Sequence, residues 1–239
     1  GYPDWAVEIS GERIKEAEQL KEKIMDKNIV YGCDHYLASQ KYGSAAEAFD
    51  KVERALESDR ERREVGFIKS LSQAWQKMML AEARASPELY MEASQLFEQA
   101  SKQSNSERTS HLTLGHSRFC RALEAGTKFA DTRDAAIHAV AIQHLESAAN
   151  YYVKAGFQNA SEYAKATELL LDAYVHMDNA KKETDPEKKT KLYTMAEKVL
   201  QTSAGSFMKA DHPEKREQVL RLLEKVQEER ELAISLAEV

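Results

Sequence analysis

The sequence predicts an all-α protein: a right-handed superhelix (α-solenoid) of about four to five antiparallel helical hairpins. Three observations support this fold class. A short packing motif recurs along the chain, most helix starts carry a recognisable capping residue, and no segment shows the alternating pattern of a β-strand.

The recurring motif places a small residue, a large apolar residue and a third small or apolar residue on one face of a helix, at positions i, i+4 and i+7. It occurs at Ala45-Phe49-Val52, Ala93-Phe97-Ala100, Ala141-Leu145-Ala148 and Ala196-Leu200-Ser203, at intervals of 48, 48 and 55 residues. Self-similarity at such a period is typical of units that bury their faces against one another. We therefore expect the motif positions to be packed between helices.

Helix starts are marked by side chains that can accept a hydrogen bond from an otherwise unpaired backbone N–H. The predicted caps are Ser44 with Glu47, Ser58 with Glu61, Ser104 with Glu107, Asn159 with Glu162, and the proline-bearing starts Ser86-Pro87, Asp185-Pro186 and His212-Pro213. These signals predict helices at about 11–41 (an interruption near 28–32 is left open), 44–57, 60–85, 87–103, 106–129, 132–156, 160–182, 186–209 and 213–237. The connections between them are short, so sequential helices are expected to run antiparallel.

We expect residues 1–239 to form a single helical-repeat domain, because a repeat array adds units without enlarging one central core. The repeats are predicted at about 11–57, 60–103, 106–156 and 160–209, with a C-terminal helix at 213–237. The sequence starts at Gly1 without a methionine and stops at Val239 inside a helical pattern, so we expect it to be a fragment of a longer protein.

The balance of charge narrows the class of partner. Asp and Glu total 40 against 34 Lys and Arg, which gives a net charge of −6, and the two signs alternate along the helices. This argues against binding to nucleic acid or to an anionic membrane. No apolar run approaches the roughly 20 residues that span a bilayer, so no integral membrane segment is expected. Cys33 and Cys120 form no CxxC motif, which favours buried thiols in the reducing cytoplasm.

The sequence offers little support for catalysis. His116 and Cys120 share a helix face and could both reach one metal ion, but a zinc site needs three or four protein ligands and no further ligand has suitable spacing. Cys33 and His35 would point about 200° apart on a helix, too far for a nucleophile and its base. The chain also has no glycine-rich phosphate loop. We therefore predict no enzyme, no metal and no cofactor.

Residues 145–157, Leu-Glu-Ser-Ala-Ala-Asn-Tyr-Tyr-Val-Lys-Ala-Gly-Phe, are echoed by residues 200–211. This segment resembles the second helix of tetratricopeptide-like hairpins, and most of all the long-helix version found in soluble NSF-attachment proteins. The resemblance covers about residues 36–230 and implies a superhelical stack of hairpins. Attachment proteins grip membrane-fusion helices through a basic surface and engage their ATPase through an acidic, leucine-containing C-terminal end. This chain is net acidic and stops at Glu238-Val239, so neither functional end is matched.

We predict a non-catalytic scaffold that binds a protein, a peptide or another domain of its own polypeptide. The first helices of the hairpins are expected to line a concave face. The candidate binding residues on that face are Lys69, Gln73, Gln76, Arg118 and Arg121, with the two arginines suited to an acidic peptide. A membrane-traffic adaptor like the attachment proteins is the alternative, and a helical-bundle metal enzyme is a third hypothesis.

Two apolar stripes are predicted to be core. One holds Ile68, Leu71, Trp75 and Met78, and the other holds Tyr163, Leu170, Tyr174 and Met177. The second stripe is expected to pack inside the fold rather than to form a ligand cage.

Overall fold

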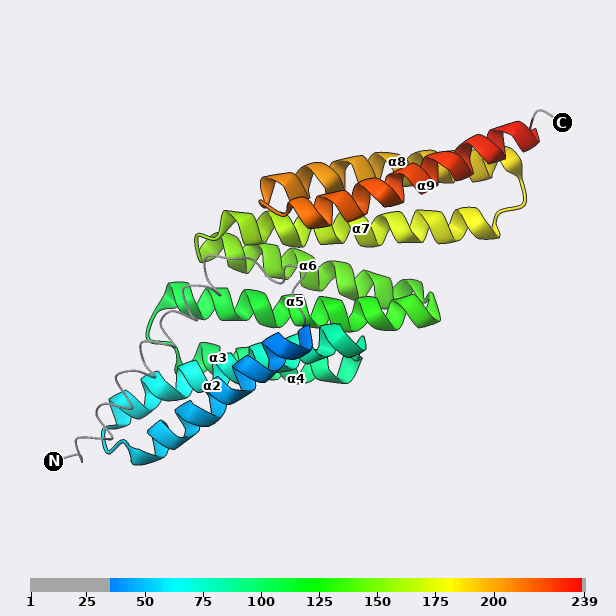
Figure 1. The fold of residues 1–239 in the computed structure, drawn as a ribbon. Coiled ribbons are helices and arrows are strands. Elements are labelled where there is room, and N and C mark those ends of the chain that lie inside the picture. The colour runs from blue at the N-terminus through cyan, green and yellow to red at the C-terminus, as the bar shows by residue number, and fades with distance from the viewer. Residues whose placement is uncertain (1–34, 238–239) are drawn as a thin grey trace. The chain divides into compact units, whose positions relative to one another are not determined.

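The computed structural model describes residues 35–237, and every regular element in that range is an α-helix (Figure 1). The described contacts fall into two compact units that meet in sequence at Phe157 and Gln158. The first unit contains α2 (His35–Ala55), α3 (Asp59–Arg84), α4 (Pro87–Gln103), α5 (Glu107–Thr132) and α6 (Ala135–Lys154). The second contains α7 (Gln158–Lys182), α8 (Pro186–Lys209) and α9 (Pro213–Ala237). The first part of the first predicted repeat, residues 11–34, lies outside the described residues, and so does Cys33.

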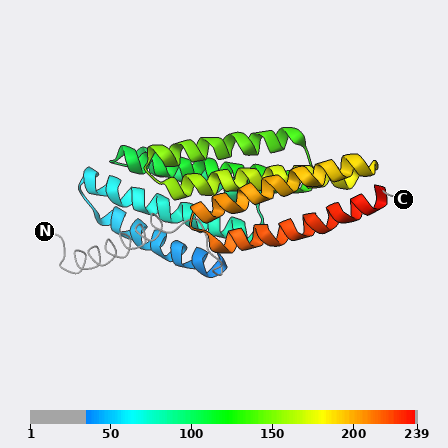
Figure 2. The same cartoon turned by 90° about the horizontal axis from the view of Figure 1, so that it is seen from above.

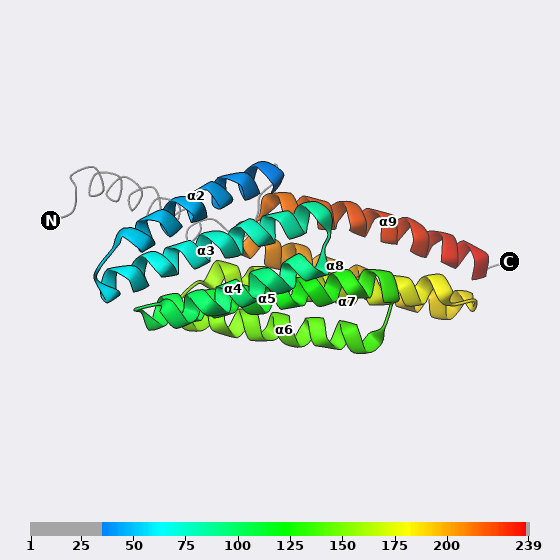
Figure 3. The same ribbon diagram turned by 90° about the horizontal axis from the view of Figure 1, so that it is seen from below.

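Within each unit, every helix packs against its neighbours in the chain. In the first unit, α2 lies beside α3, α3 beside α4, α4 beside α5 and α5 beside α6 (Figure 3). In the second unit, α8 packs against both α7 and α9, and the orange and red ribbons of α8 and α9 run side by side (Figure 2). The predicted all-α class is confirmed for the described residues, and sequential packing is consistent with a helical solenoid.

Several predicted helix starts are confirmed by their capping bonds. The Ser58 hydroxyl accepts a hydrogen bond from the backbone N–H of Glu61, and Ser86 accepts one from Leu89. The Asp185 carboxylate accepts from two backbone N–H groups at the start of α8, directly before Pro186. These side chains satisfy donors that no helical carbonyl can reach.

Three predicted caps are wrong. Helix α2 runs without a break from His35 to Ala55, so Ser44 lies inside a helix rather than at its start. Helix α5 is capped by Ser106 instead of Ser104, and α7 begins at Gln158, before Asn159.

Tertiary packing explains the continuous α2. The ring of Tyr42, before the expected break, stacks on Trp75 of α3 with ring centroids 6.2 Å apart, and Ser39 is also buried. Phe49, which follows Ser44, is buried as well. Side chains on both sides of Ser44 are thus packed, and this packing outweighs a local capping signal.

The recurring motif is buried on alternate helices, as predicted. The copies on α4, α6 and α8 are completely inaccessible to solvent: Ala93, Phe97, Ala100, Ala141, Leu145, Ala148, Ala196, Leu200 and Ser203. On α2, Phe49 and Val52 are buried and Ala45 is partly buried. Ser203, which stands where other copies have Ala or Val, donates a hydrogen bond of 2.8 Å to the carbonyl of Ala166 on α7. A polar side chain is therefore accommodated in the motif because it has a partner.

A chain of aromatic side chains crosses the first unit from α2 to α6. Beyond Tyr42, the Trp75 ring meets Phe97 at 5.5 Å and His116 at 5.1 Å, and His116 meets Tyr152 at 5.3 Å, each edge to face. Such pairs add to the stabilisation from apolar burial. The expected core stripe around Trp75 is confirmed, with Leu71 and Met78 buried beside it.

Gly115 of α5 lies directly under this aromatic chain. A Cβ atom built on Gly115 would stand 2.6 Å from Cε1 of Tyr152, and Tyr152 is fully buried and cannot swing aside. We expect Gly115→Ala to lower the free energy of unfolding by about 1–3 kcal/mol through overpacking. Chemical denaturation measures this change.

Gly205 of α8 provides the control. It also lies inside a helix, but nothing stands within 4 Å of an added Cβ. Gly205→Ala should therefore raise the free energy of unfolding by about 0.5–1 kcal/mol through helix propensity alone. Equal effects of the two substitutions would contradict the close contact between α5 and Tyr152.

Candidate functional site

The predicted binding residues on α3 form a half-buried polar face. Lys69 lies between two carboxylates of α2: its ammonium is 3.3 Å from Oδ1 of Asp50 and also bonds Glu53. Burial opposes the charge on Lys69, but the two hydrogen bonds outweigh it and raise its pKa. Gln73 is half-buried on the same face. Gln76 lies against α2, where its amide would be 2.5 Å from a Cβ on Gly43.

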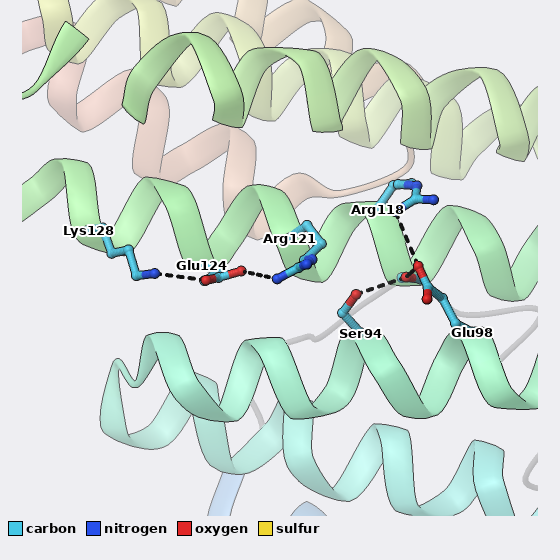
Figure 4. Close-up of polar contacts among 7 residues, drawn as sticks. Ser94, Glu98, Arg118, Arg121, Glu124 and Lys128 are labelled. Atoms are coloured by element: carbon cyan, nitrogen blue, oxygen red, sulfur yellow. Dashed lines mark hydrogen bonds and ion pairs between the residues drawn. The ribbon is translucent and has the colours of Figure 1, made fainter. Parts of the chain in front are cut away.

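The arginines predicted on α5 belong to a longer array, which we call the α5 charged stripe. It consists of Arg118, Arg121, Glu124 and Lys128 on α5 together with Glu98 on α4 (Figure 4). The α5 members are three or four residues apart, a spacing that brings side chains together along one helix face. Among the hydrogen bonds and ion pairs of the described residues, those of Lys69 go to Asp50 and Glu53 on α2, whereas that of Arg118 goes to Glu98 on α4.

Each arginine of the stripe is bound to a carboxylate. Nη1 of Arg118 lies 3.2 Å from Glu98, and Nη1 of Arg121 lies 2.9 Å from Glu124. The arginine side chains remain about a third exposed, at 30% and 34%. They are therefore held in position by protein contacts while still facing solvent.

Glu124 is the most deeply placed member of the stripe. Its side chain is only 9% exposed, and it lies between Arg121 and the ammonium of Lys128 at 2.8 Å. A carboxylate this deeply buried needs cationic partners to remain charged. Among its five members, three cations face two carboxylates, so the stripe itself has a net charge of +1 on a chain whose net charge is −6. Glu88 of α4 also lies close enough to Lys128 for their charges to interact.

His144 of α6 does not add to this charge. Burial lowers the pKa of its imidazole, and the nearby charges of Arg118 and Arg121 lower it further, against an opposing effect of Glu124. His144 is therefore neutral at pH 7, and the positive charge of the stripe comes from α5 alone.

A buried serine pair fixes α4 against α5 beneath the stripe. The hydroxyls of Ser94 and Ser117 are 2.9 Å apart, and Ser117 also donates to Glu98 at 3.4 Å. These bonds set the position of Glu98 relative to Arg118 (Figure 4). The polar contacts thus form a continuous network from the helix interface to the surface.

Sequence reasoning identified the two arginines and missed the rest of the stripe. The i, i+3 and i+4 spacing of Arg121, Glu124 and Lys128 is a signal that could have found the last two. Glu98 lies on another helix, 20 residues away from Arg118. No local pattern could have predicted that contact.

His116 and Cys120, the pair considered for metal binding, are both buried. Nδ1 of His116 is 2.8 Å from the hydroxyl of Tyr152, and burial lowers the pKa of the imidazole to about 3. Burial also raises the pKa of the Cys120 thiol, which holds it protonated. Within residues 35–237, no three His, Cys, Asp or Glu side chains are grouped so that they could hold a metal ion.

None of the helices that the structure describes is both long and apolar enough to cross a membrane. A scan of protein-family profiles, a search of curated proteins and a search of solved structures find no significant match to the sequence.

Proposed function

We propose that this protein is a non-catalytic binding scaffold of tetratricopeptide-like hairpins in a right-handed superhelix. The α5 charged stripe would hold an acidic segment of another protein or of another domain of the same polypeptide. The buried Cys120 thiol suits the reducing cytoplasm as its location. The net charge of −6 argues against nucleic acid as the partner.

The observation that carries the proposal is the separation between packing residues and charged residues. The motif on α4 is fully inaccessible to solvent, whereas Arg118 and Arg121 on the adjoining α5 are about a third exposed. Substitution of the stripe can therefore change binding without removing the core. Scaffolds of this kind recognise partners through the exposed residues of a rigid stack.

Exchange of carboxylates would allow an acidic segment to bind. Glu98 is 38% exposed, and surface ion pairs contribute at most about 1 kcal/mol, so an incoming carboxylate can replace it on Arg118 at little cost. Glu124 is nearly buried and stays in place, which keeps Arg121 oriented. The ion pairs described use one nitrogen of each guanidinium, and a guanidinium has five N–H donors in total.

Affinity capture from a lysate of the source organism, followed by mass spectrometry, tests the proposal. We expect Arg118→Gln combined with Arg121→Gln to lower partner recovery by about tenfold or more, because the net charge of the stripe changes sign. Glutamine is preferred to glutamate, since a new carboxylate beside Glu124 would destabilise the fold. Lys128 stays paired with Glu124 in this variant, so the loss of stability should be about 1–3 kcal/mol, the range for a buried group that loses one of its partners.

A matched control removes two exposed cations from the second helices of the same unit, with Lys102→Gln and Lys154→Gln. This variant should capture the same proteins as the wild type. If the stripe variant also retains them all, the stripe is not the binding surface. If the wild type specifically retains no protein, the scaffold proposal itself is wrong.

A further inference from the structure

A groove lies between α7 and α9 in the second unit, and both of these helices also pack against α8. Its volume is about 240 Å³. The residues that line it are Leu170, Tyr174, Lys215, Gln218, Val219, Arg221, Leu222 and Lys225. All of them belong to the second unit, so the groove is a property of that unit alone.

The floor of the groove is apolar and partly open to solvent. Tyr174 is 39% exposed, although the sequence pattern predicted it as core. That prediction holds for Tyr163, which is buried on the same stripe against Phe207 and His212. The stripe therefore passes from the core into the groove along α7, and Leu170 and Leu222 are half-buried beside Tyr174.

The rim of the groove is positively charged. Lys215, Arg221 and Lys225 line it, and no Asp or Glu is among the lining residues. Two carboxylates of α9 act on the rim: Glu217 pairs with Arg221 where both side chains are more than 60% exposed, and the charge of Glu224 also lies near Arg221. Three cations thus face two carboxylates, and the rim keeps a surplus of one positive charge. Burial raises the pKa of Tyr174, so its hydroxyl stays protonated and can donate a hydrogen bond.

We propose that the α7–α9 groove is a second binding site, which takes an acidic amphipathic segment of a partner protein. Apolar side chains spaced i, i+3 and i+4 on that segment would pack on Leu170, Tyr174 and Leu222. Its Asp or Glu side chains would bind the basic rim, because opposite charges across an interface favour the correct partner. The proposal does not depend on the α5 charged stripe, which lies in the other unit.

Selection from a phage-displayed library of random peptides tests this proposal with the whole 239-residue chain. Lys215 and Lys225 are ten residues apart on α9, so peptides of about 12 residues span the rim. We expect enrichment of peptides that combine Asp or Glu with Leu, Ile or Phe at helical spacing. An enriched peptide is then labelled with fluorescein, and its affinity is measured by fluorescence polarisation.

The variant Lys215→Glu with Lys225→Glu should weaken this binding by about tenfold or more, and Tyr174→Ala should do the same. Lys215 lies in the first turn of α9, where a carboxylate is favourable, so the charge reversal should not unfold the helix. The matched control is Lys191→Glu with Lys198→Glu, which makes the same change at exposed positions of α8. The control should bind as the wild type does, and thermal melting confirms that each variant is folded.

Three results would overturn the proposal. The first is selection of no acidic peptide. The second is that the groove variants Lys215→Glu with Lys225→Glu and Tyr174→Ala bind the selected peptide as tightly as the wild type does. The third is sedimentation with anionic phospholipid vesicles, lost in the charge-reversal variant, without peptide enrichment, since the groove would then be a lipid site. In the second case, peptides whose binding depends instead on Arg118 and Arg121 would support the α5 charged stripe, so the two proposals fail separately.

Discussion

Replacing Phe97 by alanine should lower the free energy of unfolding by about 3–5 kcal/mol, one of the largest effects of any single substitution in this chain. Phe97 is fully inaccessible to solvent at the second position of the repeat motif. Its ring contacts Trp75 of α3 at 5.5 Å and His116 of α5 at 5.2 Å, so its loss leaves a cavity between three helices. Urea denaturation followed by circular dichroism measures the change.

Lys102→Ala is the control for this experiment, since Lys102 is exposed on the same helix. It should change the free energy of unfolding by less than about 0.5 kcal/mol. A destabilisation of Phe97→Ala no larger than that of the control would mean that the repeat motif does not hold the helices together.

The motif could be predicted from sequence because its signal is periodic and local. Small and apolar residues at i, i+4 and i+7 lie on one helix face in any surroundings, and Phe97, Leu145 and Leu200 are all fully buried. The starts at Ser58 and Ser86 could be predicted for the same reason, because a cap bonds a backbone group only a few residues away.

The sequence-based predictions that are wrong or incomplete concern contacts between helices. Ser44 has the sequence of a cap, but the packing of Tyr42 on Trp75 extends the helix through it. Tyr174 has the periodicity of a core residue, but periodicity does not show whether the next helix covers it. In the α5 charged stripe, Arg118 was found and its partner Glu98 was missed. In each case the deciding residue is distant in the sequence.

His116 should make the fold sensitive to acid. Burial lowers the pKa of its imidazole from 6.5 to about 3 in the folded protein. Below about pH 6.5 the unfolded chain binds a proton that the folded chain does not, so stability falls as the pH drops from there toward 3. Above pH 6.5 the imidazole is neutral in both the folded and the unfolded chain, so its burial costs no stability there. Between pH 6.5 and pH 3, the decrease in the free energy of unfolding that is due to His116 reaches at most about 5 kcal/mol.

His116→Phe tests this prediction, because phenylalanine keeps an aromatic ring beside Trp75 and Phe97 and cannot bind a proton. The variant loses the hydrogen bond with Tyr152, so its stability at pH 7 alone decides nothing. The measurement is the free energy of unfolding as a function of pH between 7 and about 4 for both chains. The pKa values of His144 and His212 are also lowered by burial. These two residues titrate in the wild type and in the variant alike, so their effects cancel when the two stability curves are subtracted. The wild type should lose stability more steeply with acid than the variant, whereas parallel curves would show that the buried imidazole is not responsible.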